Sequence, residues 1–69
     1  MGYNYSKLRG KIREKFDTQE DFAKAIGKSN STISKKLNNM SDWTREEMVR
    51  ACEVLDIPLE DASLYFFAY

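Results

Sequence analysis

The sequence predicts a small all-α fold of five short helices. Apolar residues recur at steps of three and four, which is the spacing of one helix face. Residues that can cap a helix occur at Thr18, Ser29 and Thr44. A chain of 69 residues forms one domain at most, with a small hydrophobic core. We therefore expect a single helical domain over residues 1–69.

The first helix is predicted from about Ser6 to Phe16. Leu8, Ile12 and Phe16 lie on one face at helical spacing, while Lys and Arg residues occupy the other faces. Gly10 lies inside this helix, where it costs about 1 kcal/mol relative to alanine. The apolar face is expected to pack into the core.

Two further helices are predicted on either side of Gly27. The second begins after Thr18, whose hydroxyl can cap it, and the third begins after Ser29. Gly27 favours the left-handed conformation with which many helices end. Two short helices joined by such a tight turn are typical of the helix-turn-helix motif, here at about residues 18–38.

The fourth helix is predicted from about Arg45 to Leu55. Thr44 and Glu47 can form a capping box, in which each side chain accepts a hydrogen bond from the backbone N–H of the other residue. Pro58 then interrupts the chain, and a fifth helix is expected from about Glu60. The residues of the fourth helix that we expect to be buried are Met48, Val49, Cys52 and Leu55.

The composition argues against several classes of function. The chain has no His and one Cys, so neither a tetrahedral zinc site nor an intrachain disulfide is expected. No nucleophile–base pair or phosphate loop is visible, so we predict a protein that is not an enzyme and has no cofactor and no small-molecule substrate. No apolar run reaches the length of a membrane span, and no signal peptide is recognisable, which favours a cytoplasmic protein.

The formal net charge is zero, but the charges are unevenly distributed. Residues 1–40 contain nine Lys and Arg against four Asp and Glu, a balance of +5. Residues 41–69 contain two against seven, a balance of −5. Only the basic half is suited to face nucleic acid. Because phosphate neutralisation supplies the unspecific part of DNA affinity, we expect DNA binding to be modest and salt-sensitive.

Residues 29–38 carry the sharpest functional signal. In a helix, Ile33 and Leu37 lie on one side, and a polar arc of about 140° without any acidic residue lies beside them. Amides, hydroxyls and an ammonium are the groups that contact base edges and phosphates. An ordinary solvated helix face is the alternative interpretation. The arc consists of Asn30, Ser31, Ser34, Lys35 and Asn38.

These residues predict two sets of DNA contacts. Asn can pair bidentately with adenine and Lys can donate to guanine, so base contacts are predicted at Asn30, Ser31, Ser34 and Lys35. A phosphate gains from the partial positive charge of a helix N-terminus, where Gln19 stands. The predicted phosphate contacts are Gln19, Lys28, Ser29, Lys36, Asn38 and Asn39, each of which is otherwise an ordinary surface residue.

A resemblance to a known family is carried by the stretch T-Q-E-D-F-A-K-A-I-G at residues 18–27, then Ser29, Ile33, Ser34 and Leu37-Asn38. It resembles the lambda-repressor-like, Cro/C1-type helix-turn-helix family. The opening segment, the Trp43 region, the segment around Pro58 and the aromatic end are similar to short phage Cro-like and modulator-of-repression proteins. The resemblance covers nearly the whole chain.

The resemblance implies a five-helix, lambda-repressor-like helix-turn-helix DNA-binding domain in the cytoplasm of a bacterial host. By position it also implies roles for individual residues. Gln19 would lie against the DNA backbone, and Asn38 would touch a phosphate. The base contacts that it implies are Asn30, Ser31 and Lys35.

Two functions are open at this point. The first is a Cro-like transcription regulator of a phage lysis–lysogeny switch, which binds double-stranded operator DNA as a homodimer on half-sites about one helical turn apart. The second is an antirepressor that binds a partner phage repressor instead of DNA. Either function needs a protein interface, which we predict at the apolar end of the chain. Its residues are Leu64, Tyr65, Phe66, Phe67 and Tyr69, of which one or two are expected to close the core instead.

Overall fold

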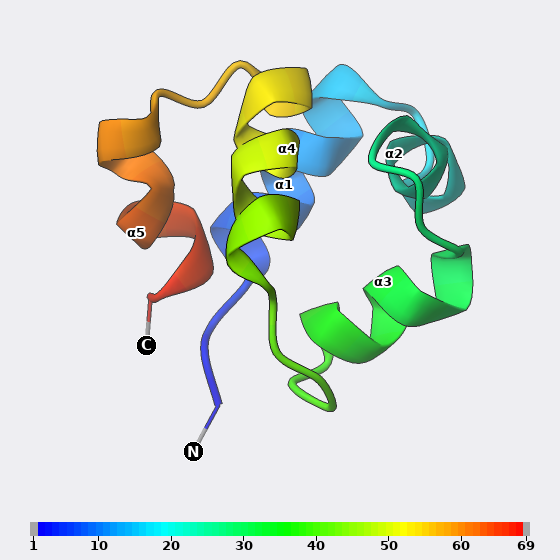
Figure 1. Ribbon diagram of the computed structural model, residues 1–69, viewed down its shortest axis with the longest axis horizontal. Coiled ribbons are helices and arrows are strands. Elements are labelled where there is room, and N and C mark those ends of the chain that lie inside the picture. The colour runs from blue at the N-terminus through cyan, green and yellow to red at the C-terminus, as the bar shows by residue number, and fades with distance from the viewer. Residues whose placement is uncertain (1, 69) are drawn as a thin grey trace.

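Five α-helices and one 3-10 turn make up the secondary structure of residues 2–68, the part of the chain that a computed structural model describes (Figure 1). No strand occurs in that range, so the predicted all-α fold of five helices is confirmed. In chain order the elements are α1 (Ser6–Lys15), α2 (Gln19–Ala25), α3 (Asn30–Leu37), α4 (Arg45–Leu55), η1 (Leu59–Asp61) and α5 (Ala62–Phe66).

The three predicted N-caps begin their helices. The Thr18 hydroxyl accepts a hydrogen bond from the backbone N–H of Asp21 at 3.1 Å, and Ser29 Oγ accepts one from Thr32 at 3.2 Å. Thr44 and Glu47 form the full capping box. Gly27 has a φ of 75°, the left-handed conformation that lets the chain turn sharply between α2 and α3.

Each helix contributes one large, fully buried side chain to the core. These are Leu8 from α1, Phe22 from α2, Ile33 from α3, Leu55 from α4 and Phe66 from α5. One shared apolar core therefore holds all five helices together.

The prediction for the buried face of α4 was partly wrong. Cys52 and Leu55 are buried, but Met48 and Val49 are only half-buried, and Ala51 and Glu47 are buried instead. The buried face of α4 is therefore shifted towards Glu47, which has a buried partner on α3 that is described below.

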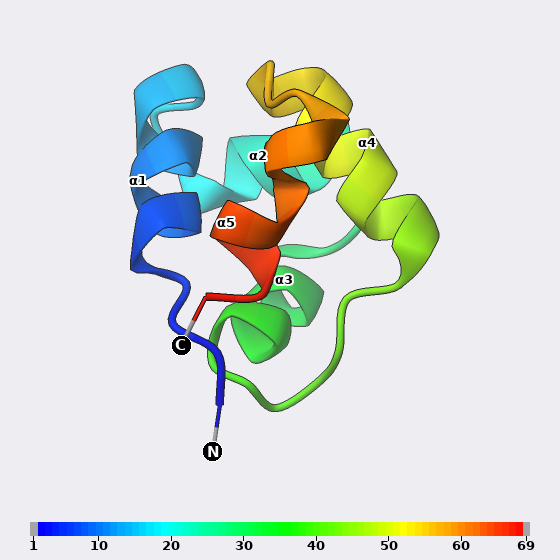
Figure 2. The same ribbon diagram turned by 90° about the vertical axis from the view of Figure 1, so that its left-hand side faces the viewer.

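The helices form two groups. α5 packs against both α1 and α4, whereas α3 packs chiefly against α2 (Figure 2). The first and last described segments lie side by side, and the backbone N–H of Asn4 donates to the carbonyl of Ala68 at 2.7 Å. Within residues 2–68, none of the helices has the length and apolar character needed to cross a membrane.

Candidate functional site

The outer face of α3 is the surface on which most of the predicted DNA contacts meet. Ile33 and Leu37 are buried on the core side of this helix. On the other side Asn30, Ser31 and Lys35 are exposed and Ser34 is half-buried. The four predicted base-contacting residues thus occupy one polar face, and α3 contains no acidic residue. Such a face can donate and accept hydrogen bonds without repelling an anion.

Gln19 at the start of α2 is bonded to this face of α3. Its Nε2 donates to Asn30 Oδ1 at 2.9 Å and to Ser34 Oγ at 2.8 Å. These hydrogen bonds fix the amide of Asn30 before any ligand arrives. They also occupy the donors of Gln19, so a phosphate contact by its side-chain N–H groups requires these hydrogen bonds to break.

The hydroxyl of Ser29 is likewise engaged at the N-terminus of α3. Besides capping the helix, its Oγ lies 2.8 Å from Thr32 Oγ1 and 3.3 Å from Ser31 Oγ. Ser29 therefore organises the first turn of α3, and any contact that it makes to a phosphate comes in addition to that role.

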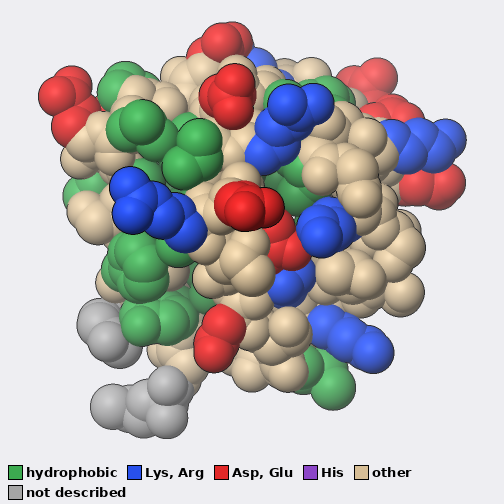
Figure 3. All heavy atoms as spheres, viewed as in Figure 1, with side chains coloured by type: hydrophobic (Ala, Val, Ile, Leu, Met, Phe, Trp, Pro, Cys, Tyr) green, Lys and Arg blue, Asp and Glu red, His purple; other side chains and the backbone are tan. Residues whose placement is uncertain are grey.

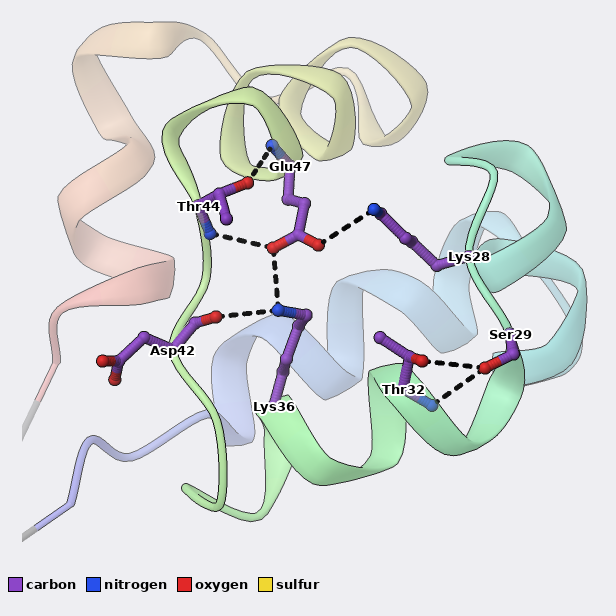
Figure 4. A network of polar contacts seen from close by, with 7 residues as sticks. All are labelled: Lys28, Ser29, Thr32, Lys36, Asp42, Thr44 and Glu47. Atoms are coloured by element: carbon purple, nitrogen blue, oxygen red, sulfur yellow. Dashed lines mark hydrogen bonds and ion pairs between the residues drawn. The ribbon is translucent and has the colours of Figure 1, made fainter.

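The prediction that Lys36 contacts a phosphate was wrong. Lys36 is only 5% exposed, and its ammonium lies 2.9 Å from Glu47 Oε1 and donates to the carbonyl of Asp42 at 2.8 Å (Figure 4). The physical reason is helical spacing, since Lys36 lies three residues after Ile33 and next to Leu37, on the core side. The long stem of a lysine can be buried when its ammonium finds a partner.

Glu47 is the buried acid that makes this arrangement stable. Its carboxylate accepts from the Thr44 backbone N–H at 2.8 Å and faces two lysines, Lys36 and Lys28 (Figure 4). Burial by itself would raise the pKa of Glu47, but the hydrogen bond from Thr44 and the ammonium of Lys36 outweigh it, and the pKa is lowered from its ordinary value. The pair was missed because only the capping box was visible in the sequence.

Lys28 and Lys35 differ in whether their ammonium groups are held by an ion pair within the protein. The Lys28 side chain is 43% exposed and its ammonium lies 3.6 Å from Glu47 Oε2. Lys35 is exposed and makes no ion pair with any residue between 2 and 68. Of the three lysines in or next to α3, only Lys35 is therefore fully available to an outside partner.

The two asparagines after α3 hold other parts of the chain. Asn38 Oδ1 accepts a hydrogen bond from Arg9 Nη2 at 3.1 Å, and Arg9 Nη2 also donates to the carbonyl of Leu37. The Asn39 side chain accepts from the Tyr3 backbone N–H at 2.8 Å and donates to the Tyr3 carbonyl at 2.9 Å. Both amides are exposed, but in the free protein they tie α1 and the N-terminal segment to the end of α3.

The aromatic end of the chain divides between core and surface. Phe66 was predicted as an interface residue, but it is 1% exposed and lies edge-on to Trp43 with ring centroids 5.2 Å apart. Leu64 and Phe67 remain 51% and 46% exposed. Tyr65 is half-buried, with the ammonium of Lys7 5.7 Å from its ring centre.

A fifth residue of the predicted interface, Tyr69, lies outside the described residues. Of the predicted interface residues that the structure describes, Leu64 and Phe67 are therefore exposed and Tyr65 is half-buried. In the face shown in Figure 3, hydrophobic side chains gather on the left, where α5 lies, while acidic and basic side chains mix over the centre.

Comparison with known proteins finds a matching family and a similar solved structure. The family described as "Protein of unknown function (DUF739)" matches residues 1–69. The solution structure of the modulator of repression of the temperate bacteriophage TP901-1 from Lactococcus lactis is similar, with a TM-score of 0.84 and 46% sequence identity. The alignment covers 97% of this chain and 90% of that one. No curated protein matches closely enough to count as a relative.

Proposed function

This chain belongs to the DUF739 family, and from its likeness to a phage modulator of repression we propose that it regulates phage repression by binding a partner repressor. In this proposal α2 and α3, with the Gly27 turn between them, form a helix-turn-helix of the Cro/C1 type. The fold would be shared with DNA-binding repressors, while the main target would be a protein.

The observation that carries this proposal is the shortage of free positive charge on the α3 face. Lys36 is buried against Glu47, and Lys28 lies 3.6 Å from the same carboxylate. Proteins that hold DNA neutralise several phosphates, and each neutralised phosphate adds to affinity through released counterions. With Lys35 as the one free lysine among these three, the α3 face of a single copy offers one free ammonium to the DNA backbone.

A second observation supports a protein partner. Leu64 and Phe67 expose an apolar surface that DNA phosphates would not use, whereas aromatic side chains are enriched in protein interfaces. The same half of the chain has a charge balance of −5 over residues 41–69. An acidic surface complements the basic DNA-binding face that a repressor must present.

Direct operator binding in the manner of Cro is the second candidate function. It is supported by the acid-free face of α3 and by the hydrogen bonds from Gln19 that fix Asn30 and Ser34. The base contacts would be Asn30, Ser31, Ser34 and Lys35, in two copies related by a homodimer axis. Both candidates are non-enzymatic, need no cofactor and act in the cytoplasm of a bacterial host.

A repressor-release assay with two matched double variants separates the candidates. The cognate repressor is bound to labelled operator DNA, and the protein is then added in increasing amounts. We expect the unmodified protein and Asn30→Ala/Lys35→Ala to lower repressor occupancy, and Leu64→Ala/Phe67→Ala to lose that effect. If the Asn30→Ala/Lys35→Ala variant is inactive and the other is fully active, the α3 face is the functional surface and operator binding becomes the better proposal.

A further inference from the structure

We propose that Glu47 is a specificity-determining residue that keeps the surface beside α3 from binding DNA phosphates. This inference rests on the proposed function, because it explains how a domain shaped for DNA is directed towards a protein partner. Glu47 would do so because its one buried carboxylate forms ion pairs with two lysines, Lys28 and Lys36.

The ammonium groups of Lys28 and Lys36 both lie within ion-pair distance of the Glu47 carboxylate. Lys28 lies just before the N-cap of α3, and Lys36 lies in its last turn. The ammonium of Lys28 is 3.6 Å from Glu47 Oε2, and that of Lys36 is 2.9 Å from Oε1. Figure 4 shows the Glu47 carboxylate between them, at the start of α4.

The carboxylate of Glu47 is buried and is held in place by the capping box. Its Oε1 accepts from the Thr44 backbone N–H at 2.8 Å, and the Glu47 backbone N–H donates to Thr44 Oγ1 at 3.1 Å. A capping box of this kind fixes the side chain of the third helical residue. The carboxylate is therefore held beside both lysines.

Lys28 is the residue whose role Glu47 changes. It lies at the N-terminal end of α3, next to the polar face, where a cation is well placed for a phosphate. Its side chain is 43% exposed and lines an open cleft of about 630 Å³ between the end of α2 and α4. There is room for the ammonium to turn outward, and the pull of Glu47 opposes that turn.

The test is a double substitution that leaves the net charge unchanged. Glu47→Gln removes one negative charge and Lys36→Met removes one positive charge, so the formal total stays at zero. Gln preserves the capping box, and Met fills the buried position without leaving an unpaired ammonium. The overall charge therefore cannot account for a change in DNA affinity.

We expect the double variant to bind a short mixed-sequence duplex about tenfold more tightly than the unmodified protein at about 50 mM salt. The plot of log affinity against log salt should become steeper by about 0.9, the value for one additional phosphate contact. Fluorescence anisotropy with a labelled duplex measures both quantities, and thermal unfolding confirms that the variant is folded.

Two triple variants identify the lysine responsible. Adding Lys28→Ala to the double variant should restore the original affinity and slope, whereas adding Lys15→Ala, which removes a surface lysine from α1, should keep the gain. Unchanged affinity in the folded double variant overturns the inference, and so does a gain that survives Lys28→Ala.

A single substitution covers the case in which the double variant does not fold. Lys28→Gln in the otherwise unmodified protein leaves the core intact and should not alter the salt slope, because Lys28 is already engaged. A slope flattened by about one unit would overturn the inference. The proposed function fails separately, if the unmodified protein itself binds operator DNA tightly and specifically.

Discussion

Removing the carboxylate of Glu47 should be one of the most damaging single changes in this protein. The residue is buried with Lys36, and the two partners are 7% and 5% exposed. Glu47→Ala leaves the buried ammonium without its counter-charge and the Thr44 backbone N–H without its acceptor. Breaking a buried ion pair from one side costs about 3–5 kcal/mol. A chain of this length has a total stability of roughly 3–10 kcal/mol, so a large part of it would be lost.

Urea denaturation followed by tryptophan fluorescence measures this loss. Trp43 is the single tryptophan and packs edge-on to the core residue Phe66, so its emission reports on the intact fold. The matched control is Lys36→Met/Glu47→Gln, which removes both charges and should change the stability by no more than about 1 kcal/mol. If Glu47→Ala is as stable as the unmodified protein, the buried pair does not hold α3 to α4.

Three further predictions concern the core, the site and the pH dependence. Phe66→Ala should cost about 3–5 kcal/mol, whereas Phe67→Ala, on the exposed side of the same segment, should cost far less in the same urea titration; equal losses would contradict the assignment of core and surface. Gln19→Ala should weaken any binding of operator DNA or repressor that uses Asn30, while it lowers the free energy of unfolding by only about 1 kcal/mol. Binding titrations with both ligands and urea denaturation measure these two effects. Unchanged affinity for both ligands would refute the prediction. The pKa of Glu47 is lowered in the folded protein, so its contribution to stability is complete above the pKa of an unfolded glutamate, about 4.3. That contribution is lost as the pH falls through the folded pKa; Glu47→Gln should therefore reduce the loss of stability in acid, and an unchanged acid profile would show that another group is responsible.

The local features of the fold could be predicted from the sequence. Thr18, Ser29 and Thr44 cap their helices through hydrogen bonds to residues three positions away, and Gly27 adopts its left-handed turn. Such features depend only on residues a few positions apart, so they can be predicted from the sequence alone. The polar face of α3 followed in the same way from helical spacing.

The features that were missed depend on contacts between distant segments. Lys36 follows Ile33 at helical spacing, so its position on the core side was visible, but its charge suggested a surface residue. The counter-charge that stabilises the buried ammonium of Lys36 is Glu47, eleven positions further along the chain. The burial of Phe66 depends in the same way on Trp43, and no local pattern distinguishes it from the exposed Phe67.

The most direct test of the proposed function is the operator affinity of the isolated protein at about 150 mM salt. We expect binding weaker than the nanomolar range that is usual for specific protein–DNA complexes, because only Lys35 of the three lysines at α3 is free. We also expect repressor occupancy of the operator to change when the protein is added to the repressor. Nanomolar, sequence-specific binding by the isolated protein would contradict the proposal of a protein partner and favour a Cro-like operator-binding function.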